Sequence, residues 1–272
     1  MRQFGNDFEK REGGYIMMSW NHFLPFAIVA SALWTVGTIA ALLHKAGRSS
    51  VCLWATAAGL VVYSAFIAGL WMSLGRPPLR TLGETRLWYS FFMVISCMAV
   101  YARWHYRWLP LTSQFVAMVF IVINIACPDI HDRSLMPALQ SAWFIPHVTI
   151  YMFSYSIFGC AFLLAVAGLT MKTDRYLATC DSLVRIGIAF LTLGMLSGCL
   201  WAKQAWGSYW SWDPKETWAA TTWAVYLGYV HHRLRSSSLI TLWWLIAGFL
   251  LLQMCWYGVN FLPTASQSMH SY

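Results

Sequence analysis

The chain has 272 residues, of which 59% are hydrophobic and only 10% are charged. Soluble domains carry about 25% charged residues, so this composition excludes an ordinary soluble domain and indicates a membrane protein. The net charge of +8 is spread through short loops without a basic run, which indicates loops that set membrane topology and argues against a nucleic-acid partner. An anionic ligand is the alternative explanation of the charge.

The chain opens with a polar segment, residues 1–16, that carries charges of both signs. It does not resemble a cleaved signal peptide, which needs a basic start followed by a short apolar core. Met17 and Met18 are therefore alternative translation starts, and residues 17–272 are expected to form a single multi-pass membrane domain. The seven cysteines of the chain include no Cys-x-x-Cys pair, which predicts neither a disulfide framework nor a zinc site.

A membrane-crossing helix needs roughly 20 apolar residues to cover about 30 Å of hydrocarbon. Eight stretches contain no Asp, Glu, Lys or Arg: 13–44, 49–75, 87–102, 108–128, 134–171, 186–202, 217–232 and 236–272. None of them alternates with the period of two that a barrel strand requires. The sequence thus predicts an all-α integral membrane protein, a bundle of about eight transmembrane helices.

Eight spans place both chain termini on one side of the membrane. The loops after the first, third, fifth and seventh spans carry nine Lys and Arg, and the tails and remaining loops also carry nine. Leaving out residues 1–16 reduces the second group to six, so the positive-inside rule favours the first group in the cytoplasm. The loop between spans six and seven and both termini are then expected on the non-cytoplasmic side.

A proline-rich loop, GRPPLRTLGE at residues 75–84, is expected on the same outer side. Its arginines, Arg76 and Arg80, suit the carboxylates of an anionic ligand, because a guanidinium binds a carboxylate through two parallel hydrogen bonds. A rigid, solvated connection between two spans is the competing interpretation.

Six tryptophans gather within residues 201–223, around the sequence WGSYWSWDP at 206–214. Interfacial tryptophans explain part of this excess, but not a compact block that contains Asp213 and Pro214. Gly207 permits unusual backbone angles, and Pro214 suits the first turn of a helix with Asp213 near its cap. The block is either a structural interfacial loop or a platform of indole faces for a flat apolar ligand such as haem.

Two of the eight histidines are expected beside that platform. His147 lies at the outer end of the fifth span, and His270 lies in the tail past the eighth span. Two neutral imidazoles on one face could supply both axial ligands of a haem iron. His231 ends the seventh span, about 21 Å along a helix from Thr217, and is either an end anchor or a ligand at a second, inner haem site.

Residues 206–218, WGSYWSWDPKETW, resemble the WWD signature of the haem-handling superfamily of cytochrome c biogenesis, which includes CcsA (also called ResC), CcmC and CcmF. The continuation PKETW is most similar to CcsA. The loop 75–84, the segment LQSAWFIPH ending at His147, and the C-terminal YGVNF with His270 are also similar to CcsA. Two departures are that Gly83 stands where the family often has Tyr, and that the tail before His270 matches loosely.

The resemblance implies a haem-binding subunit of a bacterial inner membrane or a thylakoid membrane. It would carry haem to the outer face and, with a CcsB (ResB) partner, attach it to the Cys-x-x-Cys-His motif of apocytochrome c, as part of a haem lyase. The ligand would be non-covalent haem b. The external haem would have His147 and His270 as axial ligands, and the inner haem would have His231 and a ligand from CcsB. The other residues expected around the external haem are Trp206, Trp210, Trp212, Asp213 and Arg80.

Two other functions remain open. A CcmC-like protein would deliver haem without forming a thioether, but about six spans are expected of it. A transmembrane electron-transfer cytochrome would keep its haem, but such proteins usually pair histidines across two helices inside the bilayer, whereas His147 and His270 are expected at its edge.

Overall fold

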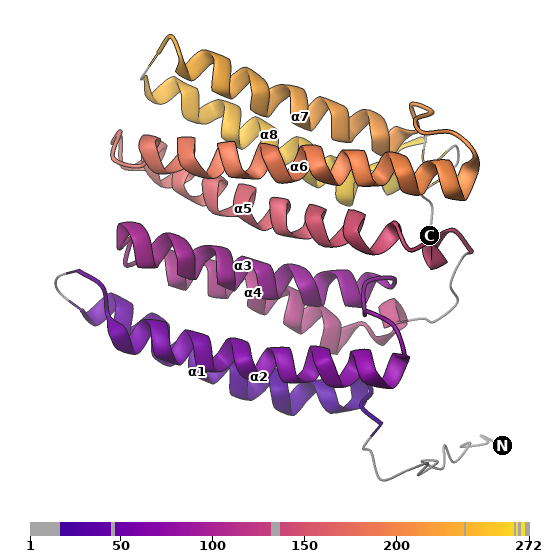
Figure 1. The fold of residues 1–272 in the computed structure, drawn as a ribbon. Coiled ribbons are helices and arrows are strands. Elements are labelled where there is room, and N and C mark those ends of the chain that lie inside the picture. The colour runs from indigo at the N-terminus through magenta and orange to yellow at the C-terminus, as the bar shows by residue number, and fades with distance from the viewer. Residues whose placement is uncertain are drawn as a thin grey trace.

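A computed structural model describes residues 17–44, 47–131, 137–236, 238–263, 265 and 268–269. Within these ranges the chain folds into eight long helices that run back and forth in chain order, and no strand occurs there (Figure 1). The helices are α1 Phe23–Leu43, α2 Ser50–Leu74, α3 Leu82–Trp104, α4 Leu109–Ala126, α5 Phe144–Thr170, α6 Leu177–Trp206, α7 Pro214–Arg233 and α8 Leu242–Trp256. Short 3-10 helices accompany them: η1 Trp20–His22, η2 Pro128–His131, η3 Pro137–Gln140, η4 Leu239–Thr241 and η5 Gly258–Phe261.

The predicted helical membrane bundle is confirmed. Among the described residues, seven helices are long and apolar enough to cross a membrane, with η1 counted together with α1 and η4 together with α8. The remaining long helix, α7, does not meet this criterion although its predicted counterpart, 217–232, is free of acidic and basic residues apart from histidine. Its Thr, Tyr and His residues lower its hydropathy, so a stretch without charge is not by that fact apolar. Even so, α7 packs along α6 and α8 (Figure 1).

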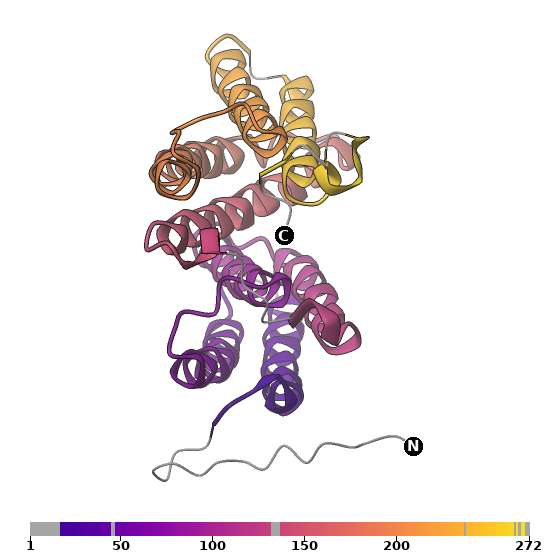
Figure 2. The same ribbon diagram turned by 90° about the vertical axis from the view of Figure 1, so that its right-hand side faces the viewer.

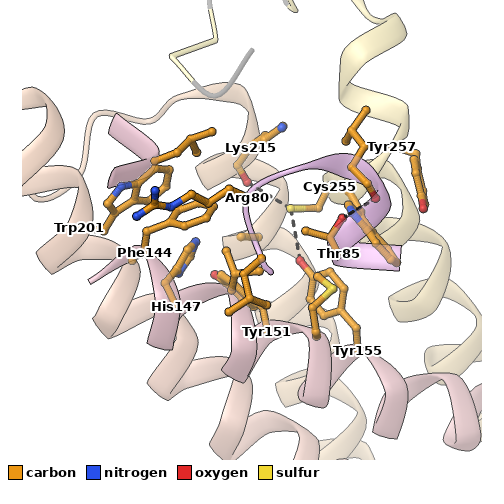
Figure 3. A pocket seen from close by; sticks show the side chains of 18 of the residues that line it. Arg80, Thr85, Phe144, His147, Tyr151, Tyr155, Trp201, Lys215, Cys255 and Tyr257 are labelled. Atoms are coloured by element: carbon orange, nitrogen blue, oxygen red, sulfur yellow. Dashed lines mark hydrogen bonds between the residues drawn. The ribbon is translucent and has the colours of Figure 1, made fainter. Parts of the chain in front are cut away.

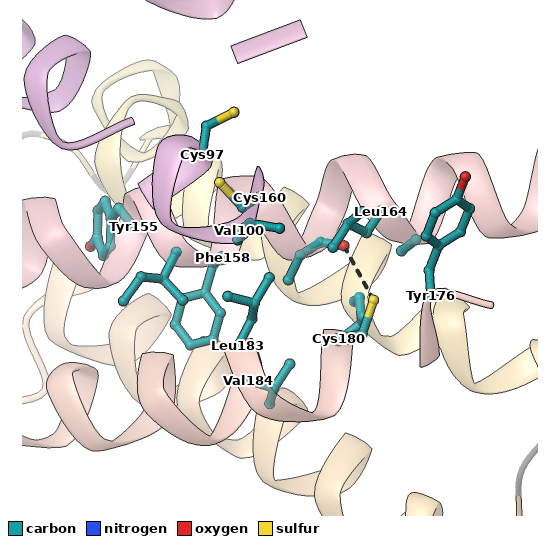
Figure 4. Close-up of a cluster of buried hydrophobic side chains, with 14 of the residues drawn as sticks. Cys97, Val100, Tyr155, Phe158, Cys160, Leu164, Tyr176, Cys180, Leu183 and Val184 are labelled. Carbon is teal, nitrogen blue, oxygen red and sulfur yellow. Dashed lines mark hydrogen bonds between the residues drawn. The ribbon is translucent and has the colours of Figure 1, made fainter. Parts of the chain in front are cut away.

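The helices stack as successive antiparallel pairs, α1 with α2, α3 with α4, α5 with α6 and α7 with α8 (Figure 2). Helix α5 lies at the centre and contacts α3, α6 and α8. Aromatic, aliphatic and sulfur-containing residues around it form a buried apolar core (Figure 4). Phe158 of this core stacks on Tyr226 of α7 at 3.7 Å between ring centroids, and a side chain at Gly187 would collide with its ring. Small residues at such contacts let membrane helices approach closely.

Two helices at the same end of the bundle begin with the same capping arrangement. At α3, the hydroxyl of Thr81 accepts the amide of Glu84, and the carboxylate of Glu84 accepts the amide of Thr81, both at 3.2 Å. At α7, Asp213 and Glu216 form the corresponding box, with Pro214 in the first turn as predicted. Each box satisfies main-chain donors that a helix start leaves open.

Several helices extend beyond the charge-free stretches that predicted them. Helix α3 begins at Leu82 and not near residue 87, because Glu84 belongs to its cap. Helix α6 runs well past 186–202 at both ends and includes Asp181 and Lys203. Asp181 forms an ion pair with Arg233 of α7, which makes a charge tolerable in the helix.

Candidate functional site

The tryptophan loop, which we define as residues 207–213, joins α6 to α7 at the end of the bundle where α3, α5 and α7 begin (Figure 1). We call this the loop end. Its first residue, Gly207, has the left-handed φ of 85° that its sequence position suggested. Trp212 also has a left-handed φ, 58°, and its side chain is 69% exposed. A bulky residue in this conformation is an outlier that the surrounding contacts must hold in place.

Asp213 is a buried clamp between the tryptophan loop and the C-terminal tail. Its carboxylate accepts the amide of Lys215 at 2.9 Å, the hydroxyl of Ser268 at 3.1 Å and the main-chain amide of Met269 at 2.6 Å. Only 4% of the residue is exposed. Predicted as a haem contact, Asp213 does not line the adjacent cavity; it caps α7 and anchors the tail one residue before His270.

A cavity of about 510 Å³ lies at the loop end, with walls from α3, α5, α6, α7 and α8. Trp210 of the tryptophan loop lines it, whereas Trp206 and Trp212 do not. Trp206 instead packs edge-on against Trp201, at 4.8 Å between ring centroids, and Trp201 forms part of the wall. The helix starts of α3, α5 and α7 all contribute lining residues, so the positive ends of three helix dipoles face this space.

His147, in the first turns of α5, lies in the cavity wall (Figure 3). Its Nδ1 lies 2.8 Å from the carbonyl oxygen of Gly194 on α6. A carbonyl only accepts hydrogen bonds, so Nδ1 carries a proton in this contact, and in the neutral form of the ring the lone pair would lie on Nε2. A metal-binding histidine is held in this way in most metal sites. The ring also stacks on Trp201, at 5.3 Å between centroids.

Two glycines on α6 make room for the aromatic groups of α5. A Cβ on Gly198 would come within 2.7 Å of Nδ1 and Cε1 of His147, and a Cβ on Gly194 would meet the ring of Tyr151 at 3.2 Å. Gly194 and Gly198 are one helical turn apart and therefore form one flat strip on α6. This strip sets how closely His147 approaches α6.

Positively charged side chains reach the cavity from the proline-rich loop and from α7, in addition to Arg86 of α3. Arg80, just before α3, extends toward the aromatic wall of Phe144 and Trp201 (Figure 3). Burial lowers the pKa of Arg80, and the neighbouring Arg76 adds to this effect, but an arginine remains protonated. Lys215, at the start of α7, also lines the cavity.

Arg76, the other arginine of the proline-rich loop, pairs with a carboxylate of its own chain and does not line the cavity. Its guanidinium binds the carboxylate of Glu84 at 2.9 and 3.0 Å in a bidentate pair, and Glu84 is 2% exposed. Glu84 also accepts the main-chain amide of Arg80 at 2.6 Å. This network fixes the loop from which Arg80 enters the cavity.

Other lining residues were not among those predicted. Arg86 of α3 lines the cavity beside Tyr257. The hydroxyl of Tyr155 donates a weak hydrogen bond to Sγ of Cys255 on α8, at 3.9 Å (Figure 3). Tyr151 packs edge-on against His147. The count of basic residues placed Arg86 at this end of the bundle, but no local sequence signal distinguishes it from an arginine that only anchors a helix at the membrane surface.

The predicted ligand of the inner haem lies elsewhere. His231 is exposed near the end of α7, at the end of the bundle opposite the cavity. Its neighbourhood is fixed by the bidentate pair of Arg233 with Asp181, whose bonds are both 2.8 Å. His270 lies outside the described residues. The structure therefore brings together His147, Arg80 and Trp210, and it separates His231 from them.

The sequence matches the family model for cytochrome C assembly protein over residues 19–266. It is 32% identical to the cytochrome c biogenesis protein CcsA of Cuscuta exaltata over 260 residues, which cover 79% of this chain and 83% of that protein. It is 31% identical to CcsA of Chlorella vulgaris over 252 residues, covering 74% of this chain and 79% of that protein. A shorter alignment with CcsA of Chlamydomonas reinhardtii is 41% identical over 157 residues, covering 51% and 42%.

Proposed function

Because this chain belongs to the cytochrome c assembly family, in the branch of the CcsA proteins, its role lies in cytochrome c biogenesis, and we propose that its loop-end cavity holds haem for attachment to apocytochrome c. The observation that carries the proposal is the setting of His147. Its Nδ1 donates to the Gly194 carbonyl, its ring lies among aromatic side chains, and it borders a cavity with several cations.

The residues present fit haem as the bound substrate. The cavity volume of about 510 Å³ lies within the roughly 300–1,000 Å³ of typical ligand pockets. Its walls are largely aromatic and aliphatic, as a flat apolar macrocycle requires. The indole Nε1 of Trp210 is buried and has no hydrogen-bond partner among the described residues, so a polar atom of a ligand can satisfy it.

Within this proposal, His147 binds the iron through Nε2. The bond from Nδ1 to the Gly194 carbonyl fixes the orientation of the ring and makes it a stronger ligand. Arg80 and Lys215 offset the charge of the propionates, which would be costly to bury without partners. His270 is proposed as the second axial ligand, and Asp213 holds the chain at the residue before it.

The attachment reaction joins each thiol of a Cys-x-x-Cys-His motif to one vinyl group of haem. The new bond links sulfur to a vinyl carbon, and the thiol hydrogen ends on the other vinyl carbon, so no external oxidant or reductant is consumed by the addition. The chain contributes positioning: it holds the substrate in one orientation while the apocytochrome binds. Both thiols come from apocytochrome c.

A CcsB-type partner and an inner haem complete the proposal. His231 is exposed on the outside of α7, where a haem bound to it lacks a second wall from this chain. The opposite ligand would then come from the partner. We place the loop end on the non-cytoplasmic side of a bacterial inner or thylakoid membrane, because the excess of basic loop residues outside 1–16 lies at the other end.

The test is co-expression of this protein with a CcsB partner and an apocytochrome c. We expect His147→Ala to remove the external share of the haem absorbance of the purified complex, to leave the share of the inner haem at His231, and to abolish thioether formation. His44→Ala, an exposed histidine at the opposite end, is the control and should retain both. Attachment that survives His147→Ala would refute the proposed site. Haem that is bound but never transferred in the wild-type complex would indicate an electron-transfer cytochrome instead.

A further inference from the structure

Arg86 is a half-buried cation whose guanidinium is incompletely paired by the part of the chain that the structure describes. It lies in the second turn of α3 and lines the cavity. Its Nη1 atom is buried and has no hydrogen-bond partner among the described residues. A guanidinium nitrogen in this state has lost its hydration without gaining an acceptor, which is costly unless a ligand supplies one.

Two acidic residues near Arg86 are engaged elsewhere. Glu84, two residues away on α3, is bound bidentately by Arg76 and also accepts main-chain amides. Glu216, another lining residue, accepts the main-chain amides of Ser211 and Asp213 in the cap of α7. Asp129, a further acidic lining residue, is exposed to solvent and forms no ion pair with Arg86. Among the described residues, the position beside Nη1 of Arg86 is therefore open to an acceptor from a ligand in the cavity.

Tyr257 holds Arg86 in one position. The Nε atom of Arg86 donates to the Tyr257 hydroxyl at 3.4 Å, and the guanidinium carbon lies 5.7 Å from the centre of the same ring. This arrangement leaves the Nη1 side of the guanidinium for another acceptor. Tyr257 lies across the cavity from His147 and Trp201 (Figure 3), so Arg86 and His147 mark opposite walls.

We propose that Arg86, held by Tyr257, is the receptor for a carboxylate of the cavity ligand, and that it fixes the orientation of the macrocycle about the iron. This inference rests on the proposed function, in which the ligand is haem. With the iron at His147 and one propionate at Arg86, the propionate edge faces the wall of α3 and α8. The vinyl groups, which lie on the other half of the ring, then face away from that wall.

The experiment compares haem with haem dimethyl ester, in which both carboxylates are blocked. The purified protein is titrated with each compound, and its absorption spectrum gives both the affinity and the iron ligation. We expect Arg86→Met to weaken haem binding about 10-fold to 100-fold, as for loss of a charge-assisted bond. Its affinity for the diester should equal that of the wild type, and the spectrum of bound haem should not change.

Arg103→Met is the matched control, because Arg103 is an exposed cation in the last turn of the same helix. It should bind both compounds as the wild type does. Arg86→Lys retains the charge and should recover part of the preference for haem over the diester. Thermal unfolding of each variant shows whether a loss of binding reflects misfolding, and Tyr257→Phe, which keeps the ring, should weaken haem binding less than Arg86→Met.

The outcomes test the carboxylate receptor at Arg86 separately from the haem site. If Arg86→Met folds and binds haem as tightly as the wild type, the carboxylate receptor is refuted while the haem site stands. If it loses affinity for haem and the diester equally, Arg86 acts on the cavity as a whole and the proposal is also refuted. Failure of the wild type to bind either compound would refute the proposed function itself.

Discussion

The carboxylate of Asp213 accepts a hydrogen bond from the main-chain amide of Met269 at 2.6 Å, across 56 residues of sequence. The same carboxylate caps α7. One acidic side chain thus joins the tryptophan loop, a helix start and the C-terminal tail. These bonds hold the chain on either side of the cavity, and the contact with the ligand that its place in the tryptophan motif suggested stays a prediction.

Replacing Asp213 should release the tail. Asp213→Ala removes the cap of α7, which costs about 1 kcal/mol, and leaves the amide of Met269 without its acceptor. We expect faster deuterium uptake in a peptide covering residues 262–272, measured by mass spectrometry. Asp213→Asn keeps one acceptor oxygen and should show a smaller effect. Asp174→Ala, at an exposed position, is the control, and unchanged uptake in Asp213→Ala would contradict the clamp.

Gly198→Ala should damage the site without removing a ligand. The new Cβ would lie 2.7 Å from two atoms of the His147 ring, so the ring must move and its bond to the Gly194 carbonyl must lengthen or break. Loss of such a supporting contact typically lowers metal affinity about 10-fold to 100-fold. Haem titration measures the change. Leu200→Ala on the same helix is the control, and wild-type affinity in Gly198→Ala would show that the ring has room to shift.

The Arg76–Glu84 pair should contribute measurably to stability. Glu84→Gln breaks a bidentate pair whose acidic side chain is 2% exposed, and it weakens the acceptor for the Arg80 amide. We expect a loss of about 3 kcal/mol in the free energy of unfolding in detergent. The double variant with Arg76→Met should cost less than the sum of the single variants, because both remove the same pair. If the losses in the free energy of unfolding of the two single variants simply add in the double variant, the two residues do not act together.

His131 should make the protein sensitive to acid. Burial lowers the pKa of this histidine, whose ring stacks on Trp20 at 3.8 Å between centroids, and nearby Arg86 adds to the effect while Glu84 opposes it. A lowered pKa means that the folded state binds the proton more weakly than the unfolded state. Stability should therefore fall as the pH drops below about 6.5, the ordinary histidine value. His131→Phe keeps the aromatic stack on Trp20 and should reduce this loss of stability, measured as the melting temperature between pH 7.5 and 5. If the melting temperature depends on pH as steeply in the variant as in the wild type, other groups cause the acid sensitivity.

Composition was sufficient to predict the class of fold, because stretches of about 20 residues without a charged side chain are mostly membrane helices. It was less informative about boundaries. Helix α6 includes Asp181, which is stabilised by Arg233 from another helix, and a count of charges along the chain cannot register that pairing. For α7, freedom from acidic and basic residues overstated how apolar the helix is.

The sequence by itself determined the elements of the candidate site that local chemistry specifies. These are the left-handed Gly207, the Asp213–Pro214 start of α7, and the location of His147 and Arg80 at the same end as the tryptophan loop. Each depends on residues that are close along the chain or on the simple alternation of spans.

Only the tertiary structure decided which groups face one another. The Gly194 carbonyl at His147, the ring of Tyr257 beside Arg86, and the amide of Met269 at Asp213 each come from a different helix or from the tail. These contacts depend on how helices rotate and approach in the bundle, which is set by small residues such as Gly198 and by packing across helices. Spacing along the sequence does not encode a helix rotation, so the cavity emerged only from the packed fold.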